Sequence, residues 1–148
     1  MFQRILIATD GSELAGKGVD KGLDLAKQIG AEVLFLVVTE PWAPGFDEAV
    51  AWSPNSVVLK EYQKSNAEMA RGILDGVSAK AVELGVEYQT LHLPDRYAAD
   101  AIIETCTQRD IDLVVMASHG RRGLGKLLLG SQTQMVLTHS TIPVLVIR

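Results

Sequence analysis

The feature that most constrains the fold of this chain is the stretch 113–133, where a short apolar run is followed by a loop with several glycines and then by a helical pattern. The apolar run, 113–117, is typical of a buried parallel strand, because strands covered on both faces lack polar alternation. Ser131 begins the helical pattern and has the side chain of a good helix N-cap. Glycines allow close backbone approach, and helix N-termini attract anions. This order of elements therefore favours a phosphate site.

The same stretch has a simpler interpretation. The glycine loop is then only a tight connection between a strand and a helix. Its three cations, Arg121, Arg122 and Lys126, form an ordinary solvated face. Spacing alone leaves both interpretations open.

The rest of the chain alternates apolar runs with helical patterns. Hydrophobic periodicity predicts strands at 4–8, 33–38, 87–92, 113–117 and 143–147, and helices at 15–29, 55–84, 98–108 and 131–139. Alternating strands and helices predict an α/β fold, an open doubly wound five-stranded parallel sheet with helices on both faces. Such sheets bind ligands at the carboxyl ends of the strands, where the strand order reverses. If the first and fourth strands are neighbours, their following turns face one crevice.

Composition narrows the class of protein. With 148 residues, 47% of them hydrophobic, the chain can form one sizeable core, so we expect a single domain over 1–148. The net charge of −4 argues against a nucleic-acid partner, and the apolar runs are shorter than a membrane span of roughly 20 residues. The start of the chain shows no signal-peptide pattern, so we expect a cytoplasmic protein. The single cysteine, Cys106, lies on an apolar helical stripe and is expected to be a buried, inert thiol.

The central stretch resembles the G-x-x-G-x9-G-[ST] signature of nucleotide-binding universal stress proteins. Its fixed positions are occupied by Ala117, Gly120, Gly130 and Ser131, and only Ala117 departs from the usual glycine. The resemblance extends over the whole chain, from the opening 8–12 to the closing 143–147. It implies a Rossmann-like fold of the adenine nucleotide alpha-hydrolase type, with strand order 3-2-1-4-5. It also implies that ATP, alone or with Mg²⁺, binds at the switch point.

The resemblance further implies a set of contacts with the nucleotide. The residues that would line the adenosine are Ala8, Asp10 and Val38, with the Asp10 carboxylate at the ribose. Those that would wall the middle of the site are Met116, Ala117, His119 and Gly120. Those that would hold the phosphates are Gly130, Ser131, Gln132 and Thr133.

Asp10 also suits this role on chemical grounds. A carboxylate at the end of a buried strand needs hydrogen-bond donors to offset its desolvation, and a ribose diol supplies two. The alternative is that Asp10 merely caps the following helix through the amides of Gly11 or Ser12. His119 is not expected to bind a metal, because no Cys or carboxylate pairs with it at ligand spacing.

The sequence also indicates how the protein acts. No catalytic set of side chains is visible, so we expect a stress-response module in which nucleotide occupancy is the switch, with at most slow ATP hydrolysis. One alternative is a dimeric interaction protein that no longer binds nucleotide, which Ala117 favours. A weaker one is a P-loop-like NTPase, because 11–17 and 120–126 both fit G-x4-G-K. Gly18 and Leu127 stand where a P-loop needs Ser or Thr.

The last strand predicts a homodimer. Residues Val144–Ile147 are apolar on both faces, yet the implied strand order puts them at the sheet edge. Such an edge has unpaired backbone groups and invites pairing with a second copy. The alternative is a monomer whose edge is covered by the long loop at 40–54.

Overall fold

The computed structural model describes residues 1–42, 56–121 and 128–148. Strands and helices alternate along the chain, as the sequence predicts. The elements are β1 (Arg4–Ala8), α1 (Glu13–Ile29), β2 (Glu32–Thr39), α2 (Val57–Leu84), β3 (Tyr88–Pro94), α3 (Ala98–Gln108), β4 (Leu113–Ala117), α4 (Ser131–His139) and β5 (Val144–Ile147).

The five strands form one parallel sheet in the order β3-β2-β1-β4-β5, which confirms the predicted topology. β1 lies at the centre, with Ile7 in register with Phe35 of β2 and with Val115 of β4. The order reverses between β1 and β4, so this is the switch point of the sheet. The turns after these two strands therefore lie at one edge.

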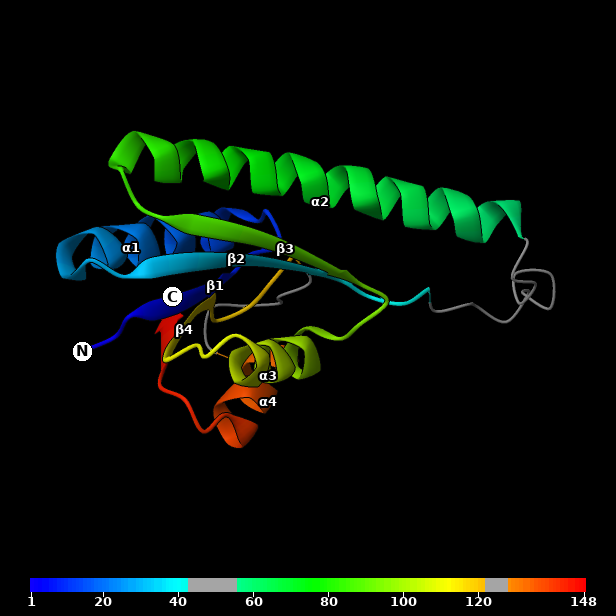
Figure 1. Ribbon diagram of the computed structural model, residues 1–148. Coiled ribbons are helices and arrows are strands. Elements are labelled where there is room, and N and C mark those ends of the chain that lie inside the picture. The colour runs from blue at the N-terminus through cyan, green and yellow to red at the C-terminus, as the bar shows by residue number, and fades with distance from the viewer. Residues whose placement is uncertain (43–55, 122–127) are drawn as a thin grey trace.

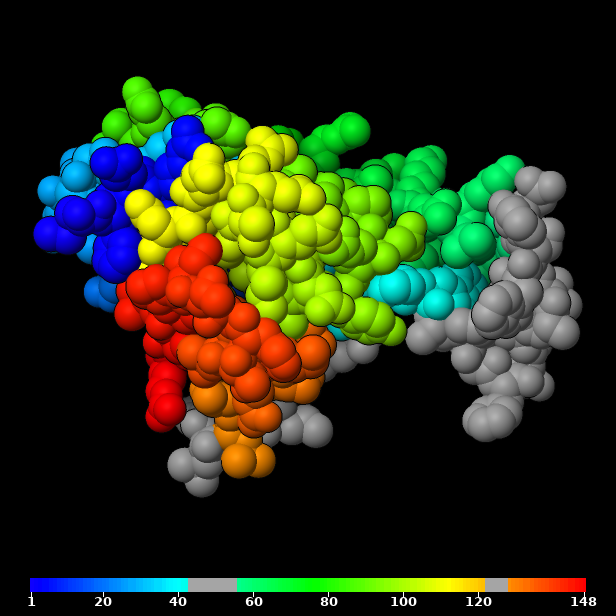
Figure 2. All heavy atoms as spheres, turned by 60° about the horizontal axis from the view of Figure 1, so that its bottom comes forward, coloured from blue at the N-terminus to red at the C-terminus, as the bar shows by residue number. Residues whose placement is uncertain are grey.

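The helices cover both faces of the sheet. Figure 1 shows α1 and α2 on one face and α3 and α4 on the other, with α2 extending beyond the end of the strands. Figure 2 shows the molecule from the side of α3 and α4, with the C-terminal segment at the edge of the molecule. The sheet is thus the middle layer of three.

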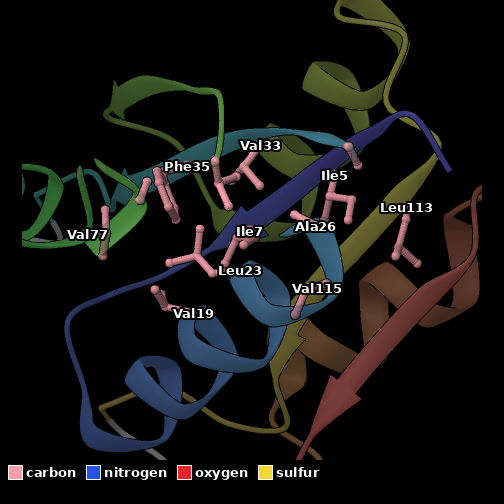
Figure 3. Close-up of a cluster of buried hydrophobic side chains, with 13 residues drawn as sticks. Ile5, Ile7, Val19, Leu23, Ala26, Val33, Phe35, Val77, Leu113 and Val115 are labelled. Carbon is pink, nitrogen blue, oxygen red and sulfur yellow. The ribbon is translucent and has the colours of Figure 1, made fainter. Parts of the chain in front are cut away.

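Each face has its own apolar core. On the α1 face, Ile5, Ile7 and Phe35 of the sheet point toward Leu23 of α1 (Figure 3). Full burial of such side chains contributes roughly 1.5–3 kcal/mol each. The helix can pack this closely because Gly22 has no side chain; a Cβ there would lie 2.5 Å from Cδ1 of Ile7.

A second core lies under α3 and α4, where Leu6, Leu36 and Val114 pack against Ile102 of α3 and Val136 of α4. Cys106 belongs to this cluster and is buried, as predicted. Burial raises the pKa of its thiol to about 11, which keeps it protonated and unreactive at neutral pH.

Glycine and serine residues define the ends of α1 and α2. Gly30 and Gly85 adopt the left-handed conformation after α1 and α2, where each amide bonds back to the last turn. Ser12 caps the start of α1, its hydroxyl accepting from the amide of Ala15 at 3.2 Å. In the described part of the chain, no helix has both the length and the apolar character needed to cross a membrane.

Candidate functional site

The candidate site begins where β1 ends. The amide of Thr9 still bonds the carbonyl of Leu36 on β2, at 3.0 Å, so the strand stays paired up to this point. The chain then turns through Gly11, whose φ of 77° favours glycine. This turn holds the half-buried side chain of Asp10 at the carboxyl edge of the sheet.

The carboxylate of Asp10 accepts hydrogen bonds from two backbone amides. The amide of Ser12 lies 2.9 Å from Oδ1, and the amide of Arg121 lies 2.9 Å from Oδ2. Burial by itself would raise the pKa of this carboxyl. Hydrogen bonds from Ser12 and from the Arg121 backbone, together with the Arg121 charge, outweigh burial and lower the pKa. The group is therefore an anion at neutral pH.

Asp10 thus joins two turns that are far apart in the sequence. The bond to Ser12 is the capping interaction expected as the alternative to ribose binding, but Asp10 also reaches the turn after β4. That turn approaches closely because of Gly120, where a Cβ would lie 2.6 Å from Oδ2 of Asp10. The two turns therefore lie side by side at the same edge of the sheet, as the strand order predicts.

The start of α4 differs in one respect from the prediction. The N-cap is Gly130, not Ser131, and Ser131 is the first helical residue. The amide of Gly130 donates to the carbonyl of Ser118 at 2.7 Å, which fixes the cap against the end of β4. A Cβ on Gly130 would lie 3.3 Å from Cα of His119, so no larger side chain fits there without displacement. Close packing, rather than side-chain capping, sets this helix start.

Two side chains anchor the first turn of α4. The buried Thr133 donates from its hydroxyl to the carbonyl of Ala117 at 3.0 Å. The side chain of Gln132 turns away toward α3, where its Oε1 accepts from the amide of Ala99 at 2.9 Å. Among the described residues, the amides of Ser131, Gln132 and Thr133 have no hydrogen-bond acceptor. They are the groups that can bind an anion here.

The remaining residues predicted to contact the nucleotide lie in two places. Some lie on the face of the sheet that α3 and α4 cover, and the others lie at the end of β4 and in the turn that follows it. Ala8 and Val38 are half-buried and pack against the core under α3. Met116 is a buried member of that core. Ala117 is buried at the end of β4. His119 is half-buried, and its Nδ1 lies 3.2 Å from the hydroxyl of Ser118.

The cations of the glycine loop are described only at Arg121. Its Nη1 lies 3.4 Å from Sδ of Met69 on α2, so the guanidinium lies against that helix. The predicted cations Arg122 and Lys126 lie outside the described residues, as does most of the long loop at 40–54. Across the described ranges, no group of three His, Cys, Asp or Glu side chains could hold a metal ion.

Two segments, 11–17 and 120–126, resemble a P-loop in sequence, and only the first lies wholly within the described residues. In the first, residues from Glu13 onward belong to α1, and the amide of Gly16 donates to the carbonyl of Ser12 at 2.9 Å. Its backbone therefore cannot cradle a phosphate. Most of the second match, 120–126, lies outside the described residues.

Sequence reasoning missed two contacts at this site. The bond between Gln132 and Ala99 joins residues 33 positions apart, and no local pattern signals it. The position of Arg121 against Met69 depends on how α2 packs, which residue spacing does not reveal.

Comparison with known proteins identifies the class. The universal stress protein family model matches residues 1–148, so the chain belongs to this family. The universal stress protein YxiE of Bacillus subtilis is 30% identical, and the match covers 100% of both chains.

Solved structures share the fold. The structure of MJ0577 from Methanocaldococcus jannaschii has a TM-score of 0.82 at 24% identity, over 99% of this chain and 96% of the other. A universal stress protein solved in complex with cAMP has a TM-score of 0.72 at 21% identity, over 99% and 97% of the two chains. The fold is therefore shared with a protein that binds an adenine nucleotide.

Proposed function

We propose that this chain binds ATP in the crevice between the turn after β1 and the start of α4. The observation that carries the proposal is the approach of the Asp10 carboxylate to Gly120, directly beside a helix start with unpaired amides. The related protein in complex with cAMP supports an adenine nucleotide as the class of ligand.

Each part of the crevice suits one part of ATP. The two amide bonds leave lone pairs on the Asp10 carboxylate, and these can accept from the ribose hydroxyls. Ala8 and Val38 offer a half-buried apolar surface for the flat face of adenine. The first amides of α4 and its helix dipole favour the phosphates.

Ala117, the departure from the family signature, is compatible with this arrangement. Side chains alternate between the faces of a strand, and Val115 and Ala117 therefore lie on the α1 side. Ala8, Val38 and Met116 pack against the core on the opposite side. The methyl group of Ala117 then points away from the proposed base surface, which weakens the case for a family member without nucleotide.

The proposed role is that of a cytoplasmic stress-response module in which ATP occupancy is the switch. Mg²⁺ would accompany the nucleotide through its phosphates. Hydrolysis, if measured, should be slow.

We also propose that two copies pair through β5. This strand lies at the sheet edge, and Leu145 in it is 39% exposed, an apolar side chain left open on an unpaired edge. Pairing with a second β5 would satisfy the outward backbone groups and cover Leu145.

Native mass spectrometry tests the proposed function. The freshly purified protein, with or without added ATP, should carry the mass of an adenine nucleotide on each chain of a dimer. GTP at the same concentration is the matched control for the base, since it carries the same ribose and triphosphate as ATP. Absence of any nucleotide adduct after addition of excess ATP would contradict the proposal and favour an interaction protein of the same fold.

A further inference from the structure

We infer that Gln132 is a positioning residue that holds the phosphate end of the site in register with the base end by capping α3. The inference rests on the proposed binding of ATP. It assigns to Gln132 a function through its side chain that differs from direct contact with phosphate.

The first observation is that α3 lacks a cap of its own. Its N-cap residue, Tyr97, makes no side-chain hydrogen bond to the helix, so the first amides of α3 need an acceptor from elsewhere. Ala99 is 1% exposed, so water cannot readily supply that acceptor. The Oε1 atom of Gln132 supplies it at 2.9 Å, from the first turn of another helix.

The second observation is that the same turn of α4 is anchored on its other side. The Thr133 hydroxyl bonds the carbonyl of Ala117 at 3.0 Å, and the Gly130 amide bonds the carbonyl of Ser118. These bonds tie the turn to β4, whereas Gln132 ties it to α3. Together they fix the direction of the amides that are proposed to meet the phosphates.

The third observation is that the start of α3 packs against the same apolar core as the proposed base surface. Ala98, the residue before the capped amide, is half-buried and packs against the same core cluster as Ala8 and Val38. A shift of the α3 start would therefore disturb the core on which the apolar surface offered to adenine packs. The side chain of Gln132 connects this core to the phosphate end of the site.

The chemistry of the amide group also separates this role from phosphate binding. The oxygen of Gln132 is an acceptor, and it is already engaged with Ala99. The Nε2 group of the same amide is a donor and is separate from this bond. The role inferred for the oxygen is to position the helix, and it is distinct from any contact that Nε2 or the backbone N–H of Gln132 makes with phosphate.

The test compares Gln132→Met with Ile102→Val in the full chain. Methionine keeps the length of glutamine but has no strong acceptor, whereas Ile102→Val removes one methyl from the buried face of α3 and leaves the cap intact. Calorimetry measures affinity for ATP and for adenosine, and hydrogen exchange followed by NMR measures protection of the Ala99 amide. Thermal unfolding shows that both variants are folded.

In Gln132→Met we expect faster exchange at Ala99 and a loss of about tenfold in ATP affinity, because small displacements of binding groups are costly. Adenosine, which lacks phosphates, should lose less. Gln132→Glu, which keeps an acceptor for Ala99, should restore slow exchange and the adenosine affinity. Ile102→Val should leave both affinities within about twofold of the unmodified protein.

Two results would overturn the inference. One is ATP affinity in Gln132→Met within twofold of the unmodified protein despite faster exchange at Ala99. The other is an equal loss in Ile102→Val, which would assign the effect to general destabilisation of α3. Failure of the unmodified protein to bind ATP is a separate outcome, because it removes the proposed function on which the inference rests.

Discussion

Replacement of Gly130 with valine should weaken ATP binding while leaving the fold intact. Gly130 has φ −61° and ψ 152°, which any residue can adopt, so the cost of substitution is steric. A Cβ would lie 3.3 Å from Cα of His119 and 3.4 Å from the carbonyl oxygen of Ser118, and both are backbone atoms that cannot rotate away. The two methyl groups of valine extend further and must displace the start of α4.

A displacement of this kind moves the amides that are proposed to meet the phosphates. We expect ATP affinity to fall at least tenfold, which corresponds to about 1.4 kcal/mol. Isothermal titration calorimetry measures the change, with Gly130→Ala expected to lie between valine and the unmodified protein. Gly76→Val is the matched control, because a Cβ at Gly76 has no atom within 4 Å. Unchanged affinity in Gly130→Val would refute the assignment of phosphates to the α4 start.

Three further predictions follow from the same structure. Asp10→Asn should lower the free energy of unfolding by about 1–2 kcal/mol at pH 7, since a half-exposed carboxylate loses charge-assisted bonds. The folded protein lowers the pKa of Asp10, so the difference in unfolding free energy between the unmodified protein and the variant is fully present above the ordinary pKa of 3.8. It should vanish as the pH falls through the pKa of Asp10 in the folded protein, and urea titrations at several pH values measure it. Val146→Pro should give monomers in analytical ultracentrifugation, because proline resists pairing at the β5 edge, and a persistent dimer would place the interface elsewhere. Gly22→Ala should cost about 1–2 kcal/mol in urea unfolding, because its Cβ would lie 2.5 Å from Cδ1 of the buried Ile7, and a neutral effect would mean that the core yields easily.

The fold was predictable because its signals are local and repeated. Apolar runs of strand length alternate with helical stripes along the chain. These patterns give the parallel sheet, and the family resemblance gave the strand order that the structure confirms. β3 lies at one edge of this sheet, and its side chains are exposed or only half-buried.

The site was predictable to a lesser extent. The strand order implied that Asp10 and Gly120 lie at the same edge of the sheet, and the structure brings them into contact. The cap of α4 was predicted at Ser131 because its hydroxyl is a common capping group, whereas Gly130 takes the position because it packs directly on the backbone of His119. Close packing between distant segments outweighed a local preference.

Side-chain contacts made to α2 and α3 by distant segments could not be predicted from the sequence. The acceptor for the Ala99 amide comes from Gln132, and the partner of the Arg121 guanidinium is Met69 on α2. Both depend on how helices settle on the sheet, which is set by the shape of the whole core. Residue spacing along the chain carries no signal for either contact.

Calorimetric titration of the unmodified protein with ATP and with adenosine tests the central claim most directly. We predict that both bind and that ATP binds more tightly, because its phosphates would meet the α4 amides and would be attracted by the positive charges of Arg121, Arg122 and Lys126. The difference should shrink as added salt screens these charges. Equal affinities at low salt would mean that the basic loop is only a solvated face. No heat with ATP, and no competition by ATP against a fluorescent ATP analogue, would contradict the claim that this crevice is a nucleotide site.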